Sequence, residues 1–317
     1  MSTRRTFLAA LAAAGLSRSR AAAPLSRIDR VRRALDGKDS DRPPYTYWYH
    51  FLDDKLPGER HAASTLEFHR KFSTDLVKVM SDYPFGPDPA NPFPEQVKAL
   101  RIVGRELKGQ ALFVETIFQP FNQAEKTSSP EKVKQLLRDN PQALLDRLEQ
   151  IARAEAAHAR LALQAGASGV FIAISNANEG YLTRDEYRKF SEPFDRMVLD
   201  GAKGAELNIL HLHGPKVYLD LFYRWPARVI QHSVAATGVP MKTVRQSYSG
   251  VLMGGVDEIR FKELTPDQMR EQIRTAREQA GPKWILSSGC SVPNDTPDRQ
   301  LLAFNQAIEA ATRDKSR

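Results

Sequence analysis

Apolar and polar positions follow two different periods along the chain. Near the start, Ile28, Val31 and Leu35 recur at helical spacing and are followed by Gly37, which predicts a helix that ends there. Beyond it, short apolar runs rich in β-branched and aromatic residues alternate with longer amphipathic stretches. The short runs predict eight strands, at residues 45–51, 76–80, 112–117, 170–174, 209–213, 229–232, 251–254 and 284–288.

Capping residues mark the starts of several helices between these strands. Thr183 and Glu186 have the spacing of a capping box, in which each side chain binds a backbone N–H at the helix start. Elsewhere a capping side chain directly precedes a proline, which suits the first helical position. This pattern occurs at Ser129–Pro130, Asn140–Pro141, Thr265–Pro266 and Thr296–Pro297.

The alternation of strands with helices predicts an α/β protein with a parallel sheet. Eight such units over about 270 residues fit a single-domain (β/α)8 barrel of the TIM type, spanning residues 24–317. An open, doubly wound sheet is the alternative, but no Gly-x-Gly-x-x-Gly turn follows the first strand and no phosphate-binding loop motif occurs. The long interval 120–141, with one short helix, predicts a flap over the barrel mouth.

Residues 1–23 differ in composition from the rest of the chain. They contain Arg4 and Arg5, then Phe7, Leu8 and a short alanine-rich apolar run, and no acidic residue. This pattern resembles a twin-arginine-type export signal, and its apolar run is shorter than the roughly 20 residues that span a bilayer. It predicts export to the periplasm without stable membrane insertion. The alternative interpretation is a basic, disordered tail.

Composition and charge narrow the classes of partner. The chain is 41% hydrophobic and 26% charged, which is typical of a globular protein, and its formal net charge is +8. Four of the arginines lie in residues 1–23, so the remainder carries only +4, with no long run of like charges. We therefore expect no nucleic-acid partner. Cys290 is the only cysteine, which excludes an intrachain disulfide.

Two histidines and the single cysteine fall at predicted strand ends. His211 and His213 end the fifth strand, and Cys290 follows the eighth. Side chains at i and i+2 of a strand project to the same side, and the C-terminal strand ends of a (β/α)8 barrel carry the reactive groups. Two imidazoles and a thiolate with an open fourth position have the composition of a catalytic zinc site. The alternatives are a structural histidine pair and a buried thiol.

Further polar residues follow the predicted strands. Glu115, near the end of the third strand, and Glu179, after the fourth, are candidates for a general acid or base or for a displaceable fourth zinc ligand. For each carboxylate, the alternative is a solvated loop position or a helix cap. Of the remaining histidines, we expect His158 at the surface and His232 behind the ligands.

Six residues are candidates for substrate binding. We expect the aromatic first strand to form a wall for a flat ligand. On the loop after the fourth strand, Tyr181 is expected to position the substrate, and after the sixth strand Arg245 is expected to pair with an anion. An aromatic strand is otherwise typical of a core. The candidates are Tyr47, Tyr49, Tyr83, Asn176, Tyr181 and Arg245.

Several short segments, in order, resemble the uroporphyrinogen decarboxylase (URO-D) superfamily. In the C-terminal half these are "HLHG" at 211–214, "LMGGVDE" at 252–258 and "SSGCSVPNDTP" at 287–297. The earlier parts are "RIDRVRRALDGKDSDRPP" at 27–44, "SDYPFG" at 81–86 and "GYLTRDEYRKFSEPF" at 180–194. The resemblance implies a (β/α)8 barrel. It also implies either a cofactor-free decarboxylase of porphyrinogens or a zinc-dependent enzyme that moves methyl groups between corrinoid proteins and thiols.

The zinc-dependent methyltransferase branch is the nearer of the two. It binds zinc through His-x-Cys on one strand and a distant cysteine, so His211 matches the first ligand and Cys290 the last. His213 stands where the first cysteine would be. Because histidine also binds Zn²⁺, the resemblance still implies a zinc cofactor. With one thiolate ligand fewer than in the methyltransferases, the bound zinc would be less electron-rich and a stronger Lewis acid. The implied substrate is a small molecule: a tetrapyrrole, a corrinoid or a thiol.

The decarboxylase branch carries arginines after its first strand, and these hold substrate carboxylates. The present sequence has "YTYWYH" at 45–50 instead, and the loss of bidentate arginines disfavours porphyrinogen decarboxylation. Two alternatives to a zinc enzyme remain open. One is a metal-independent decarboxylase in which a carboxylate such as Asp82 stabilises a protonated pyrrole-like intermediate. The other is a non-catalytic protein that binds a tetrapyrrole or corrinoid.

Overall fold

The computed structural model describes residues 24–51, 57–81 and 83–313. Its strands form one eight-stranded parallel sheet in the order β1-β8-β7-β6-β5-β4-β3-β2. The predicted (β/α)8 barrel is therefore confirmed, and seven strands lie close to their predicted positions, whereas the first covers only Tyr45–Thr46 of the predicted 45–51. They are β1 (Tyr45–Thr46), β2 (Leu76–Val79), β3 (Leu112–Phe118), β4 (Gly169–Ile174), β5 (Ile209–Leu212), β6 (Val229–His232), β7 (Val251–Val256) and β8 (Trp284–Ser288).

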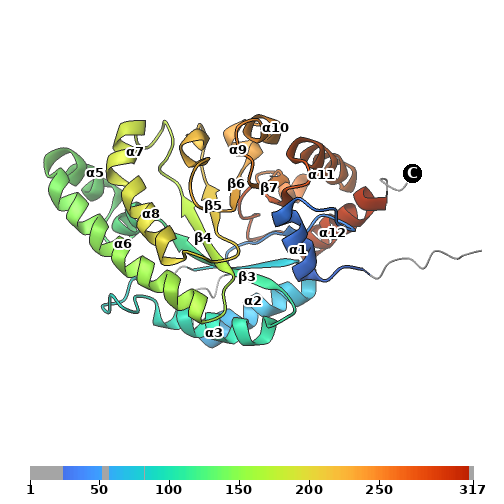
Figure 1. Cartoon of the computed structure of the whole chain (residues 1–317), viewed down its shortest axis with the longest axis horizontal. Helices are drawn as coiled ribbons and strands as arrows, with labels where there is room; N and C mark the ends of the chain where they lie inside the picture. Colours follow the sequence, from blue (N-terminus) through green and yellow to red (C-terminus); the bar gives the residue numbers. More distant parts are fainter. Residues whose placement is uncertain (1–23, 52–56, 82, 314–317) are drawn as a thin grey trace, which may run out of the picture.

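Helices surround the strands, as Figure 1 shows, with α2 and α3 at the bottom of the view and α11 and α12 at its right. The α-helices are α1 (Arg27–Asp36), α2 (Gly58–Phe72), α3 (Pro94–Leu107), α4 (Pro120–Lys126), α5 (Pro130–Asp139), α6 (Pro141–Gln164), α7 (Arg184–Phe190), α8 (Glu192–Gly201), α9 (Val234–Thr237), α10 (Met241–Arg245), α11 (Pro266–Ala280) and α12 (Asp298–Arg313). Two short 3-10 helices, η1 (Leu219–Phe222) and η2 (Phe261–Glu263), complete the elements.

Most of the predicted helix starts are confirmed. Thr183 forms the capping box with Glu186, and Ser129 and Asn140 each accept a hydrogen bond from the backbone of the following helix. The cap at Thr265 is a second capping box, closed by a glutamine. The last helix instead begins later, at Asp298, and the Thr296 hydroxyl donates to a backbone carbonyl in the preceding turn.

The interval 120–141 was expected to hold one short helix, and this is wrong. It holds two, α4 and α5, because Pro120 and Pro130 each begin a helix of their own. The first of them, α4, contributes to the lining of a pocket at the barrel mouth. The second packs beside the long helix α6, at the left of Figure 1.

Alternate strand residues fill the barrel interior. The inward-facing side chains form one apolar cluster, which includes Leu112 and Val114 of β3, Phe171 of β4 and Ile209 of β5. Residues of α1 belong to this same cluster: Val31, Ala34 and Leu35. The first helix thus packs against the barrel interior with its apolar face, and Gly37, in the left-handed region, ends it as expected.

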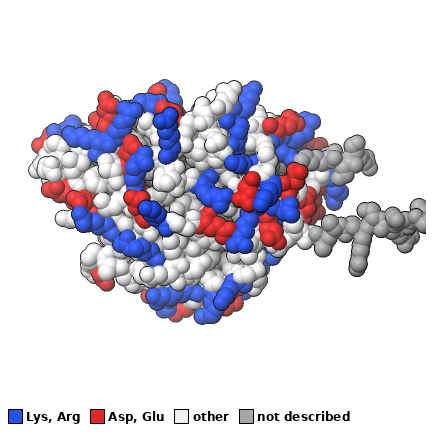
Figure 2. Space-filling view, viewed as in Figure 1, with Lys and Arg blue, Asp and Glu red and all other residues white. Residues whose placement is uncertain are grey.

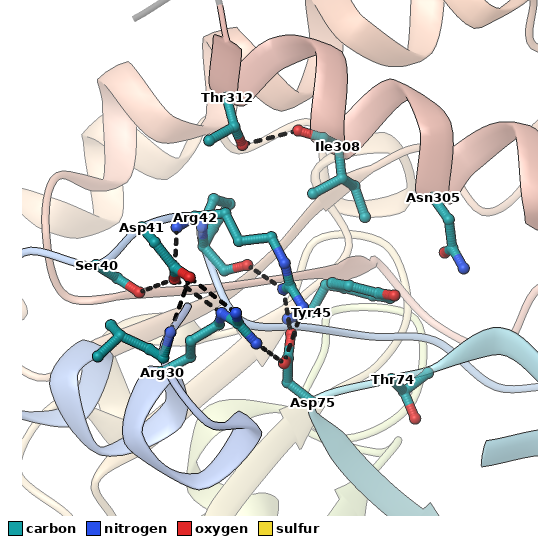
Figure 3. A network of polar contacts seen from close by, with 12 residues as sticks. Arg30, Ser40, Asp41, Arg42, Tyr45, Thr74, Asp75, Asn305, Ile308 and Thr312 are labelled. Carbon is teal, nitrogen blue, oxygen red and sulfur yellow. Dashed lines mark hydrogen bonds and ion pairs between the residues drawn. The ribbon is translucent and has the colours of Figure 1, made fainter. Parts of the chain in front are cut away.

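The sheet closes between β1 and β2 through one aspartate rather than through a strand ladder. The backbone N–H of Asp75 donates to the Tyr45 carbonyl at 2.9 Å, and the Tyr45 N–H donates to the Asp75 carboxylate at 3.1 Å. Figure 3 shows Arg30 and Arg42 converging on that carboxylate, which is fully buried. Arg30 also forms a 2.8 Å ion pair with Asp41. We call this group, Arg30, Asp41, Arg42, Tyr45 and Asp75, the seam network.

The molecular surface agrees with the low net charge of the barrel. On the face shown in Figure 2, Lys and Arg side chains are interspersed with Asp and Glu. Within residues 24–51, 57–81 and 83–313, no helix is long and apolar enough to cross a membrane.

The seam network gives a stability prediction. Asp75→Ala removes a buried carboxylate that two arginines and a backbone N–H share, so it should lower the free energy of unfolding by about 3–5 kcal/mol. Urea denaturation followed by circular dichroism measures this loss. The matched control is Glu206→Gln, which breaks an exposed pair with Arg32 and should leave the midpoint almost unchanged. Equal midpoints for the two variants would show that the seam closes without Asp75.

Candidate metal centre

His211, His213 and Cys290 meet at the C-terminal end of the barrel. The Cys290 Sγ lies 3.5 Å from His211 Nε2 and 3.5 Å from His213 Nδ1. All three potential ligand atoms lie within 4.8 Å of one another, and no other group of three or more His, Cys, Asp or Glu residues converges in this way within the described part of the chain. The residues lie in or directly after β5 and β8, two strands that are not adjacent in the sheet.

Local backbone geometry explains why these residues converge. His211 lies in β5, and His213, two residues on, projects to the same side just after the strand ends. Gly214 then has φ 107°, a conformation that strains other residues, so the chain can turn away at once. Gly289 precedes Cys290 where the backbone passes close to β6. A Cβ there would lie 2.7 Å from Ser233 Cα, so glycine permits this approach.

The two imidazoles favour the thiolate form of Cys290. Burial alone raises the pKa of the Cys290 thiol, but His211 and then His213 more than offset it, and lower that pKa to about 4. The reciprocal effect acts on His213, whose pKa is raised chiefly by its contact with the Cys290 sulfur. This effect acts while the rings carry protons towards the sulfur. Zinc would replace those protons, and would bind the sulfur as a thiolate and each ring through an unprotonated nitrogen, so the three residues form a donor set suited to zinc.

A second layer of residues supports the ligands. The Phe171 ring stacks on the His211 ring, with centroids 5.1 Å apart, and the buried Gln231 side chain contacts His211 Nδ1. Glu258, which follows β7, is buried close to Gly289, and burial raises the pKa of its carboxyl. The positions of Gln231 and Glu258 near the ligands could not be predicted from the sequence, because neither residue has a spacing that points to the site. Only the register of β6 against β5 reveals Gln231.

A pocket of about 290 Å³ opens beside the three potential ligands. Its walls combine three aromatic rings, those of Trp48, Phe118 and Phe171, with two lysines. The Lys78 ammonium lies over the Trp48 and Phe171 rings, and the Lys126 ammonium over the Phe118 ring. The other lining residues are His50, Met80, Thr116, Asn122, Ala173, Ser175, His211, His213, Cys290 and Ser291. No carboxylate is among these described lining residues.

The two predicted catalytic carboxylates that the structure describes, Glu115 and Glu179, are not among the lining residues of the pocket. Glu115 points outward from β3 and is fully buried between the barrel and its helices, where it contacts His158 and Gln96 at 2.8 Å each. Glu179 is exposed and pairs with Lys216 at 3.0 Å. Asp82 lies outside the described residues. The expected surface position of His158 is wrong, because this histidine is buried against Glu115.

The predicted aromatic wall is displaced by one residue. Tyr47 and Tyr49 point outward and pack against Phe68 of α2, and the Tyr47 hydroxyl donates to Asn305 of α12. Their neighbours Trp48 and His50 line the pocket instead. The same displacement occurs after β4, where Ser175 lines the pocket while Asn176 donates to Ser191 behind it. Strand alternation accounts for both corrections.

The other predicted substrate-binding residues also lie outside the lining. Tyr83 packs edge-on against the His61 ring, and the Tyr181 hydroxyl donates to Glu125. Arg245 has a structural role: its guanidinium donates to the backbone carbonyls of Tyr248, Gly250, Ala280 and Lys283. His232 faces away from the ligands, and its Nε2 contacts the Val239 carbonyl at 3.1 Å.

Solved structures share this fold across most of the chain. A methyltransferase from Methanosarcina mazei matches with a TM-score of 0.75 at 15% identity, covering 90% of this chain and 99% of that one. A B12-independent methionine synthase from Shewanella sp. W3-18-1 matches with a TM-score of 0.59 at 12% identity, covering 86% and 94%. A vitamin-B12-independent methionine synthase, described as putative, from Listeria monocytogenes matches at 0.54 and 10% identity, covering 92% and 95%.

Sequence comparison gives a more specific result. No curated protein matches the chain. The family described as uroporphyrinogen decarboxylase (URO-D), however, matches residues 78–311, which include every strand from β3 to β8 and all three potential metal ligands. This match covers most of the chain and agrees with the barrel and with the resemblance of its short motifs. The chain therefore belongs to the uroporphyrinogen decarboxylase family.

Proposed function

We propose that this protein is a zinc-dependent enzyme of its family that acts on a small molecule at the barrel mouth. The observation that carries the proposal is the convergence of His211, His213 and Cys290 beside a pocket. Two imidazoles and a thiolate fit zinc and leave the fourth position for a substrate. The contact of His211 Nδ1 with a buried glutamine is the kind of support that zinc-binding histidines usually have.

The chemistry follows from this donor set. When bound, zinc supplies Lewis-acid activation of a thiol, a water molecule or a carbonyl-type oxygen of the substrate. The pocket beside the potential ligands has aromatic walls, and Lys78 and Lys126 also line it, so it combines apolar and polar surfaces for a substrate. The fold that the chain shares with a methyltransferase and with methionine synthases supports methyl or alkyl transfer as the reaction class.

The size and lining of the pocket disfavour the alternatives. Its volume of about 290 Å³ lies just below the roughly 300–1,000 Å³ that ligand pockets occupy, so the pocket is too small to enclose a whole tetrapyrrole. No arginine is among the described lining residues to hold the many carboxylates of a porphyrinogen. A small thiol or a comparable molecule fits better than a porphyrinogen.

The first prediction concerns metal content. The purified protein should hold about one zinc per chain, because three protein ligands define a complete catalytic set. His211→Ala and Cys290→Ser should each weaken zinc binding more than about 100-fold, beyond the loss typical of changes around the ligands. Elemental analysis and competition with a chromophoric chelator measure both quantities.

The control for this experiment is another buried histidine. His69→Gln changes a residue that contacts Thr74 outside the pocket, and it should leave the zinc content unchanged. Wild-type protein without stoichiometric zinc, or ligand variants that retain it, would contradict the zinc-enzyme proposal. Release of carbon dioxide from a porphyrinogen would then favour the decarboxylase, and retention of a tetrapyrrole without turnover the binding protein.

The second prediction concerns His213. His213→Cys adds a thiolate, which makes bound zinc more electron-rich, so a thiol held there becomes a better nucleophile. We expect this variant to transfer the methyl group of methylcobalamin to small thiols faster than the wild type. In this reaction the thiolate forms the new carbon–sulfur bond, and the cobalt keeps the electron pair of the broken bond. The absorbance change of the cobalamin gives the rate.

Two outcomes would contradict this second prediction. If His213→Cys binds zinc but transfers methyl groups no faster than the wild type, the ligand change does not govern reactivity. If neither protein methylates any thiol of a broad panel, thiol alkylation is not the reaction, and Lewis-acid chemistry on an oxygen substrate becomes the class to test. His213→Ala serves as the matched control, because it removes the ligand without adding a thiolate.

We also propose that residues 1–23 direct the protein to the periplasm. The support is the sequence alone, with paired arginines ahead of a short apolar run. Replacement of Arg4 and Arg5 together by lysine should leave the protein in the cytoplasm, as cell fractionation and immunoblotting would show. An unchanged distribution between the fractions would favour the basic-tail interpretation.

A further inference from the structure

Gln231 lies directly beside the first potential metal ligand. In the register of β5 against β6, His211 is paired with Gln231, and both side chains point into the barrel. The Gln231 side chain is fully buried, and its Oε1 contacts His211 Nδ1. On the other side, its Nε2 donates to the carbonyls of Ser288 and Gly289, at 3.0 and 2.5 Å.

These two carbonyls fix the direction of the Gln231 amide. A carbonyl oxygen only accepts hydrogen bonds, so the group that faces Ser288 and Gly289 must be the NH₂. A flipped amide would set its own oxygen against two others. The oxygen of the amide must therefore face His211, and it accepts a hydrogen bond only if Nδ1 carries the proton.

The tautomer of His211 determines which nitrogen is available to a metal. With the proton on Nδ1, the neutral ring has its lone pair on Nε2, which is the atom 3.5 Å from the Cys290 sulfur. The other tautomer would place an N–H where the metal has to bind. Phe171, stacked on the opposite side of the ring, restricts its rotation.

We propose that Gln231 is the positioning residue of the metal centre. It holds His211 in the Nδ1–H tautomer and at the same time ties down the backbone just before Cys290, so one amide aligns ligands from β5 and from the loop after β8. The inference rests on the proposed function for the identity of the metal. The tautomer itself is a property of the metal-free protein and is testable without zinc.

The first test measures the tautomer. Metal-free full-length protein labelled with ¹⁵N-histidine is studied by long-range ¹H–¹⁵N correlation NMR at mildly alkaline pH, with the His211 signals assigned by their absence in His211→Asn. In the wild type His211 should show a protonated Nδ1 and an unprotonated Nε2. In Gln231→Leu, which offers no acceptor, the Nε2–H form should become substantially populated. A pure Nδ1–H form in Gln231→Leu would overturn the proposal.

The second test measures metal binding. Gln231→Leu should reduce zinc affinity by about 10–100-fold, the range for residues that orient a ligand, and should alter the visible spectrum of the cobalt-substituted protein. Gln231→Glu keeps an acceptor for His211 but loses the donors to both carbonyls, so it should retain the tautomer and lose affinity. This variant also keeps the size of the side chain if Gln231→Leu folds poorly.

The matched control is Gln96→Leu, which removes an equally buried glutamine that contacts Glu115 and Met80 rather than a ligand. It should reduce stability, as Gln231→Leu does, without changing zinc affinity or the cobalt spectrum. Equal affinities for Gln231→Leu and Gln96→Leu would overturn the positioning role. Absence of zinc from the wild type, together with the expected tautomer change, would instead contradict the proposed function and leave the role of Gln231 in the apo site standing.

Discussion

The alternation of side chains along parallel strands is the constraint on which the rest of this molecule depends. In a closed barrel each strand residue faces either the interior or the surrounding helices, and the sheet offers no third choice. His211 and Gln231 share the inward side because their strands are in register. Glu115, one residue before Thr116, is directed away from the pocket by the same rule and is buried among helices. A shift of one residue along a strand therefore decides whether a chemical group near the mouth faces the pocket or the helices.

The alternation of side chains also explains how much of the site could be predicted from the sequence. The barrel and the strand positions could be predicted because apolar runs and capping residues are local signals. The two-residue spacing of His211 and His213 likewise indicated that both side chains face the same way. The sequence does not show, however, that Trp48 and His50 face the pocket while Tyr47 and Tyr49 face outward, because all four positions carry aromatic rings. A run that is apolar on both faces carries no alternation to read.

The other positions that could not be predicted depend on how elements distant in the sequence are aligned and packed. Gln231 is one of many glutamines in the sequence, and it becomes important only when β6 is aligned with β5 and with the loop after β8. His158 is separated from Glu115 by 43 residues, which include α4, α5 and most of α6, so no local pattern reveals that the two are buried together. Such contacts are set by how elements pack, and a single sequence gives little information about packing.

The pairing of β1 with β8 affects how the chain folds as it is synthesised. Its two residues are paired with Leu286 and Ser287 of β8, near the other end of the chain, and Cys290 comes later still. A nascent chain still lacking β8 could form most of its helices and its central strands, because those contacts are between neighbours in sequence. It could not close the barrel or supply the sulfur ligand. Barrel closure and the metal centre thus depend on the same C-terminal segment, so a chain truncated before β8 would lack both at once.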